Sequence, residues 1–439
     1  AELRNEELWS SLVESLFGDK PGEPGSSMSA LPKRSQRSVG EALISGRRSS
    51  SLELVEGLFK GLGAVLSFGP DNPAALDAAS VWTNVLAGCA KSDLVMQRDI
   101  APVFLRELRM SAVHVVNLFA RSRPEICRDV NKLAERFSSS FLVYASQQET
   151  AAFMTTCATI CASEADFMKQ SQKELRGDDQ AAIFASIFKL LRSLLENEVL
   201  DMNTESLQKC GSFGDLEMHD AADVVFFALP LLIPLISDDL MLLPKVRDRY
   251  MFVVASLVLN HPGGVVSSSL EMLGHVIRSL EMQMVDLNEE ISRRAFEAVS
   301  ALAAHMRLKS MRGEHSNSQA ESECREFLLP MIVEGIATGN MKVHGRNWCA
   351  NALLDLMIWD QDSATFQKAG EALLARSGNP ENRSRMVHVL RSIHESAETA
   401  RQQLHKADVA RAQQRKARED FFSDTLEFSR KAQTILGAG

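Results

Sequence analysis

The sequence predicts an all-α fold, a right-handed α-solenoid of HEAT-like helical hairpins, from two observations. Between residues 222 and 304, two amphipathic helical hairpins of ~40 residues follow one another, which is typical of HEAT-type repeats. Aromatic residues make up only 6% of the chain, whereas large β-sheet proteins usually contain more of them. Solenoids of this kind usually present long surfaces to other proteins, so binding is expected rather than catalysis.

Apolar periodicity and turn residues define both hairpins. The first is expected to contain helices at 224–236 and 240–259, and the second helices at 265–285 and 289–304. Ser237-Asp238-Asp239 forms the turn of the first hairpin, and His261-Pro262-Gly263-Gly264 separates the two hairpins, because Pro and Gly interrupt helices.

The rest of the chain alternates apolar helical runs with short breaks. Further helices are expected at 2–17, 52–68, 73–90, 94–120, 124–145, 149–175, 180–197, 323–337, 346–359, 363–376 and 382–407. Pro73 suits a first helical turn, whereas Pro102 is expected to interrupt the 94–120 region early. The breaks at Gly339 and Gly378 carry the residue that most often ends a helix.

Composition divides these elements into segments. The expected segments are a partial N-terminal helix at 1–17, a mobile Ser/Pro/Gly-rich loop at 18–50, HEAT-like repeats at 51–200, an inter-repeat loop at 201–217, HEAT-like repeats at 218–400 with a polar insert at 308–322, and C-terminal capping helices at 401–439. A chain of 439 residues is too long for one ordinary core and long enough for several domains or for one elongated array.

Two segments allow a binding or regulatory interpretation beside a structural one. Arg47-Arg48 precede Ser49 and Ser50, which suits phosphorylation by a basophilic kinase, but a serine-capped helix start is the alternative. The second segment combines basic with apolar side chains and is interpreted as a docked capping helix or as a basic binding face. Its residues are Arg401, Lys406, Arg411, Arg415, Lys416 and Arg418, followed by Phe421, Phe422, Leu426, Phe428 and Ile435.

No catalytic, cofactor-binding or metal-binding residue is expected. Phosphate-binding glycine loops, HExxH and GxSxG motifs are missing, and the ten histidines are scattered. The carboxylate pairs Asp238-Asp239 and Glu289-Glu290 stand at expected helix starts, where they cap the helix and favour its dipole. The seven cysteines, including Cys157 and Cys161 on one helix face, are interpreted as reduced, buried thiols. The chain is therefore not expected to be an enzyme.

Charge and hydropathy exclude two further classes of partner. The net charge of −9 argues against nucleic acid, because phosphate binding requires clustered Lys and Arg. The longest apolar run, 224–236, contains two prolines and is too short to span a bilayer, so no membrane insertion is expected. The N-terminal segment lacks a signal-peptide pattern, and a start at Ala1 indicates a processed chain or a fragment.

Several segments in series resemble the C-terminal HEAT repeats of exportins in the importin-β (karyopherin) family. The segments are Leu229-Pro230-Leu231-Leu232-Ile233-Pro234-Leu235-Ile236-Ser237-Asp238-Asp239-Leu240, Leu243-Pro244-Lys245-Val246-Arg247-Asp248-Arg249-Tyr250, Ser279-Leu280-Glu281-Met282-Gln283-Met284, Glu289-Glu290-Ile291, Phe296-Glu297-Ala298-Val299, Arg415-Lys416-Ala417 with Phe421-Phe422, and Leu426-Glu427-Phe428. The resemblance covers about half of the chain, roughly 222–436. The resemblance does not account for the insert at 313–322 or the loop at 18–40.

The resemblance implies a nuclear transport receptor that shuttles between cytoplasm and nucleus. Its partners would be protein cargo, Ran-GTP and the Phe-rich repeat proteins of the nuclear pore, and cargo and Ran-GTP would raise each other's affinity. The main Ran contact of such receptors would lie upstream of Ala1. The alternative is a HEAT or armadillo scaffold or regulatory subunit unrelated to transport. Extended flat interfaces leave no short motif, so no partner-binding residues are assigned.

Overall fold

The computed structural model describes an entirely helical protein. The described residues are 33–34, 36–38, 57–61, 63, 67, 73–90, 101–141, 145–171, 174–198, 218, 220–312, 318–341, 347–404 and 411–437. Every regular element in these ranges is a helix, and none of them is a strand. The chain divides into two compact units, Ala1–Tyr250 and Met251–Gly439. The predicted all-α helical-repeat fold is thus confirmed, and each unit is considered by itself below.

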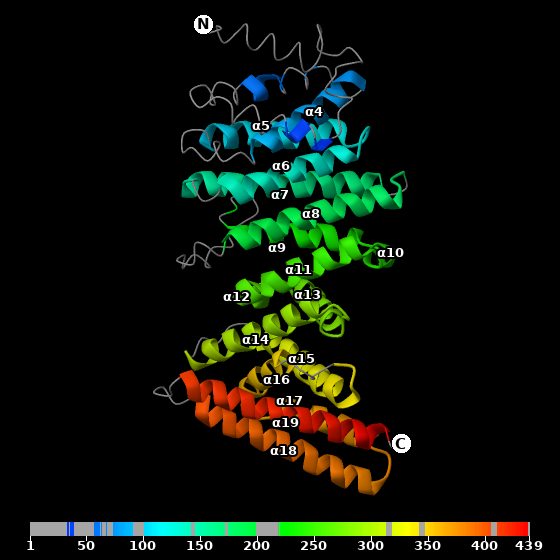
Figure 1. Ribbon diagram of the computed structural model, residues 1–439, viewed down its shortest axis with the longest axis vertical. Coiled ribbons are helices and arrows are strands. Elements are labelled where there is room, and N and C mark those ends of the chain that lie inside the picture. Colours follow the sequence, from blue (N-terminus) through cyan, green and yellow to red (C-terminus); the bar gives the residue numbers. More distant parts are fainter. Residues whose placement is uncertain are drawn as a thin grey trace. The chain divides into compact units, whose positions relative to one another are not determined.

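Helices of the first unit stack in two layers (Figure 1). Its principal helices are α4 (Pro73–Cys89), α5 (Ala101–Phe119), α6 (Glu125–Phe141), α7 (Gln147–Gln170), α8 (Gly177–Glu198) and α9 (Ala221–Leu232). Helices α4, α6 and α8 pack in series in one layer, and α5, α7 and α9 pack in series in the other. Each helix therefore packs on the helix two places along the chain, as in an array of stacked hairpins.

Aromatic rings connect successive helices through the core of this unit. The ring centroids of Phe59 and Phe104 lie 5.2 Å apart, those of Phe104 and Phe137 lie 5.6 Å apart, and those of Phe137 and Phe153 lie 4.7 Å apart. All four side chains are buried. Such pairs add about 0.5–1.5 kcal/mol to the free energy gained by burying the rings themselves.

Helix boundaries in the first unit follow local capping chemistry. At the start of α7, the Ser146 hydroxyl accepts a hydrogen bond from the Glu149 N–H, while the Glu149 carboxylate accepts one from the Ser146 N–H. This capping box satisfies two backbone donors that the helix leaves free. Pro102 lies in the first turn of α5, where a missing N–H costs nothing, and residues 94–100 of the predicted 94–120 region lie outside the described residues.

Proline also divides one helix that the sequence predicted as continuous. The region 240–259 forms the short α10 (Asp238–Met241) and then α11 (Pro244–Asn260), which contains the boundary between the two units. Pro244 is the first residue of α11, because its fixed φ and missing N–H suit a helix start and oppose a helix interior. The preceding α9 likewise ends before Pro234, which lies in the 3-10 turn Ile233–Leu235.

The second unit repeats the two-layer arrangement. Its helices are α12 (Pro262–Ser267), α13 (Leu270–Met284), α14 (Glu289–Met311), α15 (Ser318–Thr338), α16 (Trp348–Trp359), α17 (Ala364–Arg376), α18 (Pro380–Leu404) and α19 (Arg411–Gly437). Helices α12, α14, α16 and α18 pack in series, as do α13, α15 and α17. Helix α19 lies along α18 and also packs against α15 and α16 (Figure 1).

Capping explains where the second unit departs from the predicted elements. The expected helix 265–285 divides between α12 and α13 because the Ser269 hydroxyl accepts a hydrogen bond from the Met272 N–H and starts a new helix. The expected insert 308–322 is helical up to Met311 and again from Ser318. Gly339 (φ 78°) and Gly378 (φ 69°) adopt the left-handed conformation that ends a helix at low cost.

Arginine side chains join neighbouring helices of the second unit. The Arg294 guanidinium lies 3.8 Å from the ring centroid of Phe252, and that of Arg293 lies 5.9 Å from the Trp348 ring. Arg293 and Arg294 also pair with Glu290 in the first turn of α14. These contacts combine cation–π attraction with ion pairing at a helix start.

The apolar face of α19 is docked and its basic face is partly used for anchoring. Phe421, Phe428 and Ile435 are at most 3% exposed, which agrees with the docked-helix interpretation. A guanidinium nitrogen of Arg418 lies 2.8 Å from the Asp355 carboxylate on α16, and that carboxylate is largely buried. Among the described residues, no helix is both long and apolar enough to cross a membrane.

The Arg418–Asp355 ion pair yields a stability prediction. Arg418→Met should lower the free energy of unfolding by ~2–3 kcal/mol, because it leaves the buried Asp355 carboxylate without its counter-charge. Arg415→Met is the matched control, since Arg415 is exposed on the same helix and pairs only with the exposed Glu419; its effect should stay within ~0.5 kcal/mol. Urea denaturation measures both, and equal effects would contradict the anchoring role.

Candidate functional site

Buried thiols do not form a metal site. No group of three or more His, Cys, Asp or Glu in the described part of the chain is placed to hold a metal ion. The six cysteines there, all but Cys210, are buried and free. Burial raises the pKa of the Cys89 and Cys324 thiols to about 12, and it also raises the pKa of Cys157. Protonated thiols are poor nucleophiles and poor metal ligands, so these side chains serve packing.

The paired carboxylates lie in first helical turns, as predicted. The side chains that cap the backbone N–H groups, however, belong to the residues that precede them. Ser237 accepts a hydrogen bond from the Leu240 N–H at the start of α10, and Asn288 accepts one from the Glu290 N–H at the start of α14. Glu290 binds Arg293, and this hydrogen bond lowers the pKa of the Glu290 carboxyl to about 2. Its charge is therefore fixed at neutral pH, which is unsuited to acid–base catalysis.

One serine and one histidine approach the geometry of a nucleophile and its base. Ser363 Oγ lies 2.9 Å from His394 Nε2, and Ser363 has a φ of 57°, which is rare for residues other than glycine. However, the backbone N–H groups of Ala364, Thr365 and Phe366 donate to the side chains of Asp362 and Asp360. Because these N–H groups already have acceptors, they are not available to stabilise an oxyanion, as acyl transfer requires. We therefore interpret the Ser363–His394 contact as part of the start of α17.

A buried carboxyl group lies between α6, α7 and α8. Glu164 is fully buried, and Asn131 Nδ2 donates hydrogen bonds to both of its oxygens at 3.0 and 2.8 Å. The same nitrogen lies 2.9 Å from Ser186 Oγ on α8, so the cluster joins three helices. Desolvation raises the pKa of Glu164 to about 8. Glu164 and Asn131 are buried while Ser186 is partly exposed, and we interpret the cluster as a structural network that fixes the register of these helices.

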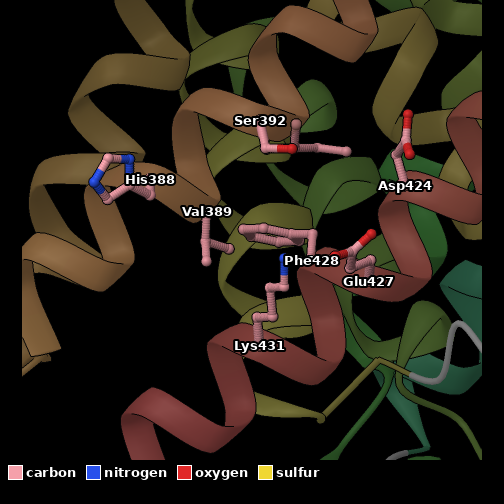
Figure 2. A pocket seen from close by; sticks show the side chains of 8 residues that line it. His388, Val389, Ser392, Asp424, Glu427, Phe428 and Lys431 are labelled. Atoms are coloured by element: carbon pink, nitrogen blue, oxygen red, sulfur yellow. Dashed lines mark ion pairs between the residues drawn. The ribbon is translucent and has the colours of Figure 1, made fainter.

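A groove between α18 and α19 is the open site with the most varied chemistry. Two adjoining hollows, of about 80 and 360 Å³, share His388, Val389 and Lys431 and together form this groove. Figure 2 shows Val389 of α18 and Phe428 of α19 facing one another across the smaller hollow. The full lining is Arg385, His388, Val389, Ser392 and Ile393 from α18, and Asp424, Glu427, Phe428, Arg430, Lys431, Thr434 and Ile435 from α19.

The two ends of the groove differ in charge, since the acidic residues line only the smaller hollow. Lys431 Nζ lies 2.5 Å from the Glu427 carboxylate, and Ser396 Oγ donates to the Asp424 carboxylate at 2.5 Å. The Lys431 hydrogen bond lowers the pKa of the Glu427 carboxyl. Arg385 and Arg430 make no ion pair with any described residue, and both are exposed. The larger hollow is thus flanked by two guanidinium groups, one from each helix, and the charge of Arg430 also contributes to the lowered pKa of the Glu427 carboxyl.

Sequence reasoning located only part of this site. The predicted apolar residues Phe428 and Ile435 form its floor, but the basic residues singled out from Arg401 to Arg418 lie elsewhere or outside the described residues, as Lys406 does. His388 was assigned to a scattered set, and Arg385 and Arg430 were not identified. The available signal was the spacing of Arg385, His388 and Val389 on one helix face, which becomes informative only when α19 is placed beside it.

Comparisons with known proteins do not assign a family. No protein-family model matches the sequence. Among solved structures, the chain is similar to the crystal structure of an engineered protein from the Northeast Structural Genomics Consortium, with a TM-score of 0.36 and 12% identity. That match covers 97% of this chain and 99% of the other. A likeness at this level supports no conclusion on function, so the proposals below rest on the sequence and the structure of this chain.

The buried Glu164 yields a pH-dependent prediction. Between about pH 5 and pH 8 the folded carboxyl keeps its proton while the unfolded one is ionised, so the free energy of unfolding falls as pH rises, by at most ~1.4 kcal/mol per pH unit. Glu164→Gln should remove this fall, because glutamine does not titrate. Denaturation at several pH values measures the difference between the two proteins. Asp166→Asn, at an exposed position of the same helix, is the matched control, and parallel wild-type and Glu164→Gln profiles would contradict the assignment.

Proposed function

We propose that the chain acts as a nuclear transport receptor similar to exportin-4, which binds protein cargo together with Ran-GTP for export from the nucleus. The observation that carries this proposal is the ordered resemblance to the exportin C-terminal repeats. Its segments keep the chain order over several helices: 229–240 runs from α9 to α10, 243–250 lies at the start of α11, 279–284 on α13, 289–299 on α14 and 415–428 on α19. A chance likeness of single apolar helices would not reproduce this order.

Surface chemistry supports protein binding over catalysis. Large apolar side chains are exposed at helix ends, including Leu242 (76%), Leu287 (90%) and Met311 (62%). Such residues are common singly on protein surfaces, so they are compatible with a protein contact without marking one. The groups that come closest to catalytic geometry, at Ser363 and Glu164, are satisfied by neighbouring polar groups or closed to solvent. A binding role at protein surfaces, without a reaction of its own, is therefore the better-supported proposal.

The proposed partners follow from the transport function. They are protein cargo, Ran-GTP and the Phe-rich repeat proteins of the nuclear pore, and the chain would move between cytoplasm and nucleus. The competing proposal is a helical scaffold or regulatory subunit unrelated to transport. Both share the fold, so they differ in one observable: whether partner binding depends on the nucleotide state of Ran.

Nucleotide-dependent binding tests the proposal. A longer chain that contains this segment together with the upstream Ran-binding repeats, once immobilised, should retain Ran loaded with a non-hydrolysable GTP analogue at least about tenfold better than Ran-GDP, and nuclear extract should increase that retention. A coupling of ~1–3 kcal/mol between cargo and Ran-GTP would raise the affinity for Ran-GTP by roughly 5- to 150-fold when extract is added. Quantitative immunoblotting of Ran with and without extract provides the readout. Equal retention of both nucleotide forms would favour the scaffold interpretation and contradict the exportin interpretation.

A further inference from the structure

We propose that the groove between α18 and α19 binds an acidic peptide segment that carries one apolar side chain. The proposal is independent of nuclear transport, because it depends only on residues of this helix pair. The expected ligand is a peptide. The groove combines apolar and cationic groups over a distance that matches one side chain and its flanking residues.

Cations at the larger hollow supply the charge complementarity. Arg385 of α18 and Arg430 of α19 line the hollow from opposite sides, and neither makes an ion pair with a described residue. The chain as a whole carries a net charge of −9, whereas the residues that line this hollow include two arginines and one lysine and no acidic residue. The planar guanidinium matches a carboxylate with two parallel hydrogen bonds, which favours Glu or Asp side chains in the ligand.

Apolar side chains form the floor between these cations. Val389 and Ile435 line the larger hollow, and Phe428 lines the smaller one beside them (Figure 2). The larger hollow measures about 360 Å³, which is enough for one leucine- or phenylalanine-sized side chain. Burial of such a side chain contributes affinity, while the arginines on either side select acidic neighbours.

The acidic residues of the groove do not repel an acidic ligand at the larger hollow, which Arg385 and Arg430 line. Glu427 is paired with Lys431, and Asp424 accepts a hydrogen bond from Ser396, so both carboxylates already have partners on the smaller hollow's side. The same two carboxylates disfavour a nucleic acid, whose evenly spaced phosphates would require cations along the whole groove. The arrangement therefore favours a ligand with acidic residues near Arg385 and Arg430.

Fluorescence anisotropy with a labelled, glutamate-rich peptide containing one central leucine tests the proposal. The chain should bind this peptide, and raising the salt concentration should weaken binding, because both arginines are exposed. A peptide with serine in place of leucine should bind about tenfold more weakly, and a peptide with lysines in place of glutamates should not bind.

Matched variants separate the groove from general surface charge. Arg385→Glu and Arg430→Glu should each weaken binding by on the order of tenfold, and Thr434→Trp, which fills the larger hollow from an exposed position, should abolish it. Arg383→Glu and Lys416→Glu change the same charge at exposed positions of α18 and α19 outside the groove, and they should bind as the wild type does. Thermal melts of all five variants should coincide with that of the wild type.

Several results would overturn the proposal. They are an absence of peptide binding to the folded wild type, equal losses in the groove and control variants, or equal binding of the serine-substituted peptide. Binding of a single-stranded oligonucleotide as tight as that of the peptide would assign the surface to anions in general. None of these results bears on Ran, so failure here and failure of the transport proposal remain distinguishable.

Discussion

Burial of apolar helix faces between two layers is the constraint on which the rest of this structure depends. In the first unit α6 packs on α4 and α8, while α7 packs on α5 and α9, and in the second unit α14 packs on α12 and α16. A single hairpin cannot bury both of its helices' apolar faces, so each depends on the next along the chain. The buried rings from Phe59 to Phe153 show this dependence directly, since each ring packs on one from another helix.

Buried polar groups then determine how the layers are aligned. Apolar side chains tolerate small shifts in packing, but hydrogen bonds require defined distances and angles. Asn131 and Ser186 therefore hold α6 and α8 against Glu164 of α7, and Arg418 holds α19 against Asp355 of α16. Each of these groups would be costly to bury alone, so its partner has to be in place when the helices meet.

Local sequence features made most of the helices predictable, whereas features that depend on contacts between distant residues were not predictable. Apolar periodicity predicted α8 and α17 closely, whereas the continuous apolar pattern at 240–259 and 265–285 concealed helix starts at Pro244 and Ser269. Periodicity reports which face is buried and is insensitive to a cap that interrupts the helix without changing that face. The α18–α19 groove was less predictable still, because Arg385 and Arg430 lie on different helices and only their packing brings them to one hollow.

The most useful guide to function in this protein is which charged side chains have a partner of opposite charge and which do not. In the interior, ionisable groups are paired, as Asp355 is by Arg418, or are kept neutral by burial, as Glu164 is. At the surface, most ion pairs join residues three or four apart on one helix and contribute little to stability. Arg385 and Arg430 belong to neither group, since they flank an apolar floor from two helices at a hollow that no acidic residue lines. Folding does not require that combination, and a ligand that supplies both a carboxylate and an apolar side chain accounts for it.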